Sequence, residues 1–350
     1  MKLYTKKFAA ALFTIFITGV GQMVTAQEVQ FSQFYASSLY LNPALAGVEN
    51  DFTVNSNFRS QWISSSSSQI TTQLSAIMPL YASSGRKGLM GGVGLGLFTD
   101  GSGAGGAMRQ TGFRASYAYS FGLDNDLHRF SFGAQAGFTQ RAIDANAQWG
   151  SQYVNGNYDP NLIPDNVGVN NRVSHGVFNL GAFWSFNPAR NYYRAGTSGY
   201  SGIAIGNLNR PNVSLTDNGT DQLPVVIKYH GGLELHGTRR FNFGPQVLVA
   251  ATQGHGNQIN AGISANYKLI DNPFGLLGNT DLLFSGWYRV GNGVIAAVGI
   301  SNATYTLGFS YDLTTSSLGN YNNGNGAYEI SFSIRNAKDK RRRRFDTPRI

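Results

Sequence analysis

The chain has 350 residues, no cysteine, 44 glycines and only 13% charged residues. The lack of cysteine excludes a lipoprotein anchor, disulfide bonds and thiolate metal sites. The formal net charge of +9 is concentrated at the two ends, where residues 1–26 hold three lysines and residues 338–350 hold seven basic and two acidic residues. Because the centre is close to neutral, the charge does not indicate a nucleic-acid-binding protein.

Residues 1–26 have the pattern of a secretory signal peptide. Lys2, Lys6 and Lys7 precede an apolar run over 8–20, and small residues lead up to Ala26. No later stretch reaches the roughly 18 consecutive apolar residues that a membrane-spanning helix needs. We therefore predict an exported protein that is cleaved between Ala26 and Gln27.

Residues 27–51 are predicted to form a docked segment, which contains the opening stretch FSQFYASSLYLNPALAG. The aromatics do not alternate cleanly, Pro43 lacks a backbone donor, and Asn42-Pro43 favours a turn, so neither a regular strand nor a helix is indicated. The segment could be a latch at the periplasmic rim, a first irregular strand, or a plug inside a barrel. The candidate plug or partner-contact residues are Phe31, Gln33, Phe34, Tyr35, Leu41, Asn42, Pro43 and Gly47.

Residues 52–336 alternate between apolar and polar positions, as in Phe52, Val54 and Phe58 against Thr53, Asn55 and Asn57. The period-two pattern recurs in about fourteen segments, an even number that suits a closed bacterial barrel. A soluble β-sandwich would also alternate. However, the polar face is mostly Ser, Thr, Gly and Asn, as in a lumen, and Tyr and Phe are frequent near strand ends, as in interfacial girdles. The prediction is an all-β, antiparallel, transmembrane outer-membrane β-barrel with both ends in the periplasm and its longest connection, 142–171, outside.

Two groups of residues resemble chemical sites without the context that those sites need. Gly101, Gly103 and Gly106 match G-x-G-x-x-G, but a strand rather than a helix is predicted to follow them. His230, Glu234 and His236 share one strand face and could serve a metal ion or an acid/base pair. Equal-parity neighbours are about 6.6 Å apart, so we expect a polar lumen wall here. We expect no enzyme activity, no cofactor and no metal.

The tail over 337–350 contains the run Arg341, Arg342, Arg343 and Arg344. Such a run can bind an acidic partner or an anionic surface, or it can be a solvated end. A contact on the periplasmic side is the functional prediction for it.

The opening stretch resembles the start of mature PorP/SprF proteins, whose motif is similar to F-S-Q-[FY]-x(5)-L-x-L-N-P-A-x-A-G. Later segments also resemble the family in the family's order, among them GFSYDLTTS at 308–316 and YEIS at 328–331. The resemblance implies an outer-membrane component associated with type IX secretion and gliding motility.

The resemblance also implies partners. They are other type IX secretion components and a secreted adhesin or cargo protein, bound or anchored through its C-terminal region, with outer-membrane lipid around the barrel and no nucleic acid. The runner-up prediction is a small porin for solutes, which an open lumen would favour and a filled one would oppose. An outer-membrane enzyme would need His230, Glu234 and His236 to converge with other lumen groups.

Overall fold

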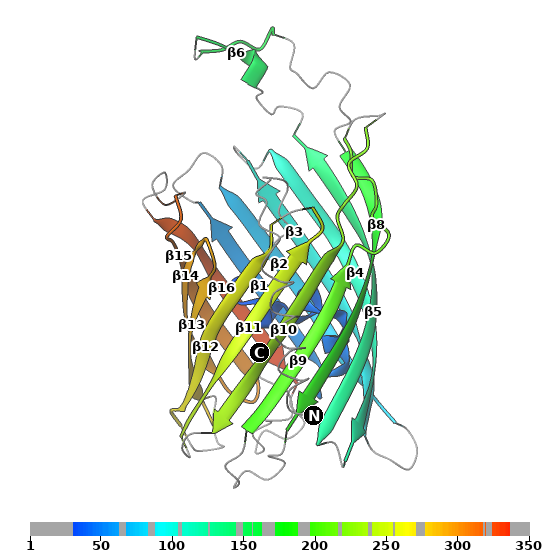
Figure 1. Ribbon diagram of the computed structural model, residues 1–350, viewed down its shortest axis with the longest axis vertical. Helices are drawn as coiled ribbons and strands as arrows, with labels where there is room; N and C mark the ends of the chain where they lie inside the picture. Colours follow the sequence, from blue (N-terminus) through cyan, green and yellow to red (C-terminus); the bar gives the residue numbers. More distant parts are fainter. Residues whose placement is uncertain are drawn as a thin grey trace, which may run out of the picture.

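The computed structural model forms a barrel around a short N-terminal segment (Figure 1). It describes residues 31–62, 68–82, 88–103, 107–124, 127–144, 150–155, 157–162, 172–187, 197–215, 219–236, 240–254, 256–270, 277–317, 319 and 324–336. The predicted cleavage site at Ala26 and Gln27 and the basic tail lie outside these residues. Both therefore stay predictions.

The wall is a closed antiparallel sheet of 14 strands. Each strand pairs with the next along the barrel, and β1 closes the sheet on β16 with Phe58 opposite Ile330. The strands are β1 (Thr53–Gln61), β2 (Gln69–Tyr81), β3 (Leu89–Ser102), β4 (Met108–Leu123), β5 (His128–Ile143), β8 (Arg172–Phe186), β9 (Thr197–Gly206), β10 (Val226–His236), β11 (Phe241–Thr252), β12 (Gln258–Lys268), β13 (Asp281–Arg289), β14 (Gly293–Ser301), β15 (Tyr305–Thr314) and β16 (Asn325–Arg335).

The two faces of the wall follow the alternation in the sequence. On β4, Tyr117 and Tyr119 point outward and are 55% and 47% exposed, whereas Ser116 and Ser120 point inward and are buried. Large apolar side chains are exposed in this way on nearly every strand, which is the arrangement that a lipid-facing band requires. The predicted barrel of about fourteen strands is confirmed.

The connections differ in length at the two ends. The longest one leaves β5 and carries η4 (Gly150–Gln152) with the hairpin of β6 (Tyr153–Val154) and β7 (Asn157–Tyr158), which lies beyond the barrel end in Figure 1. It shares that end with the connections after β3, β9 and β15, as the strand order predicted. The connections after β8 and β12 are also long but lie at the opposite end, where β1 begins and β16 ends. Strand alternation alone did not indicate their length.

Three short helices lie inside the barrel, drawn in blue in Figure 1. They are η1 (Phe34–Ser37), α2 (Ser38–Leu41) and η2 (Pro43–Gly47). In the described part of the chain, no helix has the length and apolar character to cross a membrane. Gly101 lies in β3, Gly103 directly follows it, and Gly106 lies outside the described residues. The next element is strand β4, so a strand rather than a helix follows these glycines, as predicted.

Candidate functional site

The candidate site is the segment that occupies the bore, residues 31–48, which we call the plug. It contacts β1 to β5, β8 and β16 from the inside, and nearly all of its residues are buried. The sequence allowed a latch at the rim, a first irregular strand or a plug, and in the structure the segment is a plug inside the lumen. All candidate residues of the opening stretch belong to it: Phe31, Gln33, Phe34, Tyr35, Leu41, Asn42, Pro43 and Gly47.

A buried charged network holds the start of the plug, and we call it the Ser32 anchor. The Ser32 N–H donates to Glu329 Oε2 over 2.7 Å, and the Ser32 hydroxyl donates to Asp312 at 2.7 Å. The Gln33 N–H donates to Glu329 Oε1 at 3.2 Å. The Gln33 side-chain amide donates to the Ser310 hydroxyl through Nε2 and accepts from the Ser331 hydroxyl at Oε1. Hydrogen bonds to ionised carboxylates are shorter and stronger than neutral ones, so this contact fixes the plug backbone on β15 and β16.

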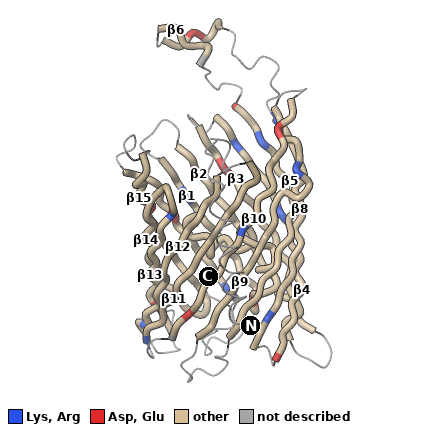
Figure 2. The backbone as a smooth tube through the Cα atoms, viewed as in Figure 1, with Lys and Arg blue, Asp and Glu red and all other residues tan. Residues whose placement is uncertain are grey.

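Two wall arginines balance the carboxylates. Arg59 Nη2 lies 2.9 Å from Asp312 Oδ2, and Arg59 Nη1 lies 3.6 Å from Glu329 Oε2. Arg289 Nη1 lies 3.3 Å from Asp312 Oδ2, and both arginines donate to the Ser32 hydroxyl oxygen. Figure 2 shows how sparse charged residues are along the strands. Because all four charged side chains are buried, removing one would leave another without compensation.

A second, uncharged contact holds the turn of the plug, and we call it the Asn42 anchor. Asn42 Oδ1 accepts from the Ala44 N–H at 2.9 Å, which caps η2. Asn42 Nδ2 donates to the Ala182 carbonyl at 3.1 Å and to the Ile203 carbonyl at 3.2 Å. It also lies 3.1 Å from His230 Nε2. Since an amide nitrogen only donates, this contact requires His230 Nε2 to be the acceptor.

Glycines on the inner face of the wall make room for the plug. A Cβ atom added at Gly181 would lie 2.0 Å from Asn42 Oδ1, and one at Gly92 would lie 1.9 Å from the Ala46 carbonyl oxygen. Glycine is therefore required where the wall and the plug backbone approach this closely. Similarly short distances to plug residues or to His230 occur at Gly94, Gly133, Gly202 and Gly308.

Apolar and cationic side chains fill the space between the two anchors. Phe34 meets Trp287 edge-on with ring centroids 4.9 Å apart. The Tyr40 ring has Arg114 Cζ at 4.4 Å and Lys228 Nζ at 5.2 Å from its centroid, a cation–π arrangement on the inner wall. The plug is thus held both by packed aromatic side chains, as in a protein core, and by the polar contacts of its anchors.

The acidic residues that follow the plug have a different environment. Burial raises the pKa of the Glu49 carboxyl above its usual value, whereas the charge of Arg335 acts in the opposite direction and Asp51 adds to the rise. These residues line a recess between the plug and β13 to β16. The recess opens at the barrel end where β1 begins.

Of the group His230, Glu234 and His236, the two residues whose side chains are described have separate partners. His230 belongs to the Asn42 anchor, and the Glu234 carboxylate meets Ser198 at 3.4 Å and Asn242 at 3.3 Å. The side chain of His236 lies outside the described residues. Among the described residues there is no group of three or more His, Asp or Glu side chains that could hold a metal ion.

The prediction missed the wall half of the Ser32 anchor, which consists of Arg59, Arg289, Asp312 and Glu329. A signal was present, because Asp312 and Glu329 lie in the two later segments that resemble the family. They also lie on lumen-facing positions, Asp312 as the one charged residue of β15 and Glu329 on β16, where the other charged residue is the terminal Arg335. The sequence does not show that these positions pair with Ser32 across the bore.

A family model described as type IX secretion system membrane protein PorP/SprF matches residues 23–334. The chain belongs to the PorP/SprF family. Membership implies interaction with other components of the secretion system, and together with the barrel it places the protein in the outer membrane. No curated protein matches the chain.

Solved structures similar to this PorP/SprF protein are also barrels. The toluene transporter TbuX of Ralstonia pickettii is 10% identical with a TM-score of 0.48, and the match covers 86% of this chain and 93% of TbuX. A FadL homologue of Pseudomonas aeruginosa is 11% identical with a TM-score of 0.40 and coverages of 85% and 94%. These similarities assign no ligand to this chain.

Proposed function

We propose that this PorP/SprF protein serves type IX secretion as an interaction frame that binds or anchors a secreted surface protein, such as an adhesin, through that partner's C-terminal region. The observation that carries the proposal is the occupied bore. The plug is fixed at two places and fills the lumen with packed side chains, so the ends of the barrel and its loops are left as contact surfaces. No catalytic group is needed for this role.

The proposed orientation has both ends of the barrel domain in the periplasm and the β5–β8 connection outside. Long external loops and short periplasmic turns are the usual arrangement of bacterial outer-membrane barrels, and this orientation puts the longest connection outside. Outer-membrane lipid would contact the apolar outer face.

A small porin is the second candidate, because the inner face of the wall is lined with Ser, Thr, Asn and Gln side chains. The plug opposes it. A solute path would need the Ser32 and Asn42 anchors to open.

Crosslinking and co-purification of the full chain from outer membranes test the proposal. Recovery of secretion components together with a large surface protein, lost when that protein's C-terminal region is deleted, is the expected result. Purification without partners, combined with steady single-channel conductance in planar bilayers, would instead favour the porin. Conductance should be absent from the parent protein while the plug is in place.

A further inference from the structure

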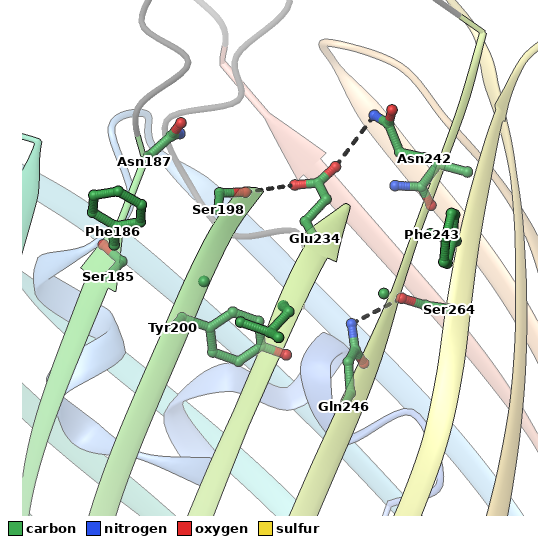
Figure 3. A pocket seen from close by; sticks show the side chains of 14 residues that line it. Ser185, Phe186, Asn187, Ser198, Tyr200, Glu234, Asn242, Phe243, Gln246 and Ser264 are labelled. Carbon is green, nitrogen blue, oxygen red and sulfur yellow. Dashed lines mark hydrogen bonds between the residues drawn. The ribbon is translucent and has the colours of Figure 1, made fainter. Parts of the chain in front are cut away.

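A second pocket lies in the wall at the barrel end where β1 begins and β16 ends. Its inner part lies next to the Asn42 anchor, because the ring centroids of Tyr200 and His230 are 6.3 Å apart. It is formed by residues of β8 to β12 and is open to solvent. Figure 3 shows the side chains around it, including Ser198, Tyr200, Glu234, Asn242, Gln246 and Ser264.

The pocket coincides with an interruption in the wall. Pairing between β10 and β11 runs to Gly232 opposite Gln246 and resumes at Leu235 opposite Phe243. Pro245 lies in the gap and has no N–H to donate, so it cannot contribute a donor to the pairing of the strands. The pocket lies beside this interruption and is lined by residues from both of its strands.

Tyr200 forms the inner part of this recess and is 8% exposed. Its ring lies across Gly232, where an added Cβ atom would meet the Tyr200 hydroxyl at 2.9 Å. Within the described residues the hydroxyl has no hydrogen-bond partner. A buried hydroxyl without a partner costs free energy, so its position in a pocket points to a group supplied from outside.

Glu234 is the single charged residue among those that line the pocket. Its neighbours Ser198 and Asn242 are neutral and contact it at 3.4 and 3.3 Å, one on each side, as Figure 3 shows. A carboxylate has about four acceptor positions, so these two long hydrogen bonds leave it able to accept more.

We propose that this pocket binds the cationic side chain of an arginine or lysine in an extended peptide. Glu234 would pair with the cation, the Tyr200 hydroxyl would accept a hydrogen bond from the cation, and the neutral serine and asparagine side chains would bond the peptide backbone. This goes beyond the anchoring of a secreted partner, because it requires only a basic segment at this end of the barrel.

Two sources could supply that segment. The first is the chain's own run from Lys338 to Arg344. The 14 residues that follow Asn336 can extend about 46 Å, whereas a 14-stranded barrel with strands about 4.8 Å apart and tilted about 40° is about 28 Å across. The second is a basic segment of another protein on the same side.

The experiment uses the full chain in detergent and a fluorescent peptide with the sequence KDKRRRR, followed by anisotropy. We expect saturable binding that Glu234→Gln weakens at least tenfold and Tyr200→Phe weakens by a smaller factor. Glu49→Gln is the matched control, because it removes a carboxylate from the other recess at the same end, and it should leave binding unchanged.

Equal affinity of the parent and Glu234→Gln would overturn the proposal, as would equal binding of a peptide whose arginines are replaced by glutamine. Ser198→Lys gives a second test, since a lysine beside Glu234 should abolish binding. Thermal unfolding shows whether each variant is folded. The source is resolved in a full chain with Arg341, Arg342, Arg343 and Arg344 changed to glutamine: tighter peptide binding than the parent assigns the pocket to the chain's own tail, and unchanged binding assigns it to another protein.

Discussion

The two anchors both hold the plug against the inner wall of the barrel, but they do so with different chemistry. The Ser32 anchor uses two buried arginines and two buried carboxylates, which compensate one another and present charged acceptors to the plug backbone. The Asn42 anchor uses a neutral amide, two backbone carbonyls and an imidazole, and it depends on the absence of side chains at the facing glycines.

This difference predicts how each anchor responds to substitution of its residues. A buried charged network loses its balance when one member is removed, whereas a close-packed neutral contact fails when an atom is added. The first is therefore sensitive to truncation and the second to enlargement.

The largest effect is expected from truncating the charged network. Arg59→Ala removes a partner of both Asp312 and Glu329, and breaking a buried pair in this way costs roughly 3–5 kcal/mol of stability. We expect a lower free energy of unfolding in detergent and the appearance of conductance as the plug loosens. Arg109→Ala, at an exposed position on β4, is the control. If both variants behaved alike, the charged network would not hold the plug.

A smaller effect is expected from adding one methyl group at the neutral anchor. In Gly181→Ala the new Cβ would lie 2.0 Å from Asn42 Oδ1, so the turn must shift, at about 1–3 kcal/mol for overpacking. Gly286→Ala is the matched control, because no heavy atom lies within 4 Å of its added Cβ. Protease access to the plug should rise in the first variant alone, and equal access in both would argue against the glycine cradle.

The barrel could be predicted because the pattern that indicates it involves only residues close together in the sequence. A two-residue period needs only neighbours in sequence, and it identified each wall strand and the lumen-facing parity of Arg59, Asp312 and Glu329. The turn at Asn42-Pro43 was predictable for the same reason, since a proline and an asparagine act on their own backbone.

The anchors could not be predicted, because they form only when the barrel closes and brings residues that are distant in sequence into contact. Ser32 and Glu329 are 297 residues apart in sequence and meet only when β16 closes on β1 and the plug lies between them. His230 illustrates the same limit. Its strand face was correctly inferred, but its partner is an amide in the plug rather than a second titratable group.

The smallest effect concerns Glu49, which follows the plug at the rim. Burial raises the pKa of its carboxyl in the folded protein above the ordinary value of 4.5, so protonation favours the folded state. Its unfavourable contribution is absent below about pH 4.5, grows as the pH rises towards the raised pKa and is complete above it. Glu49→Gln cannot ionise and should therefore unfold at the same temperature as the parent at pH 4 and at a slightly higher temperature at pH 7. Asp124→Asn, at an exposed turn, should show no such difference. A Glu49→Gln variant that is less stable than the parent at pH 7 would mean that attraction to Arg335 outweighs burial, and that the rim, like the Ser32 anchor, is held by charge.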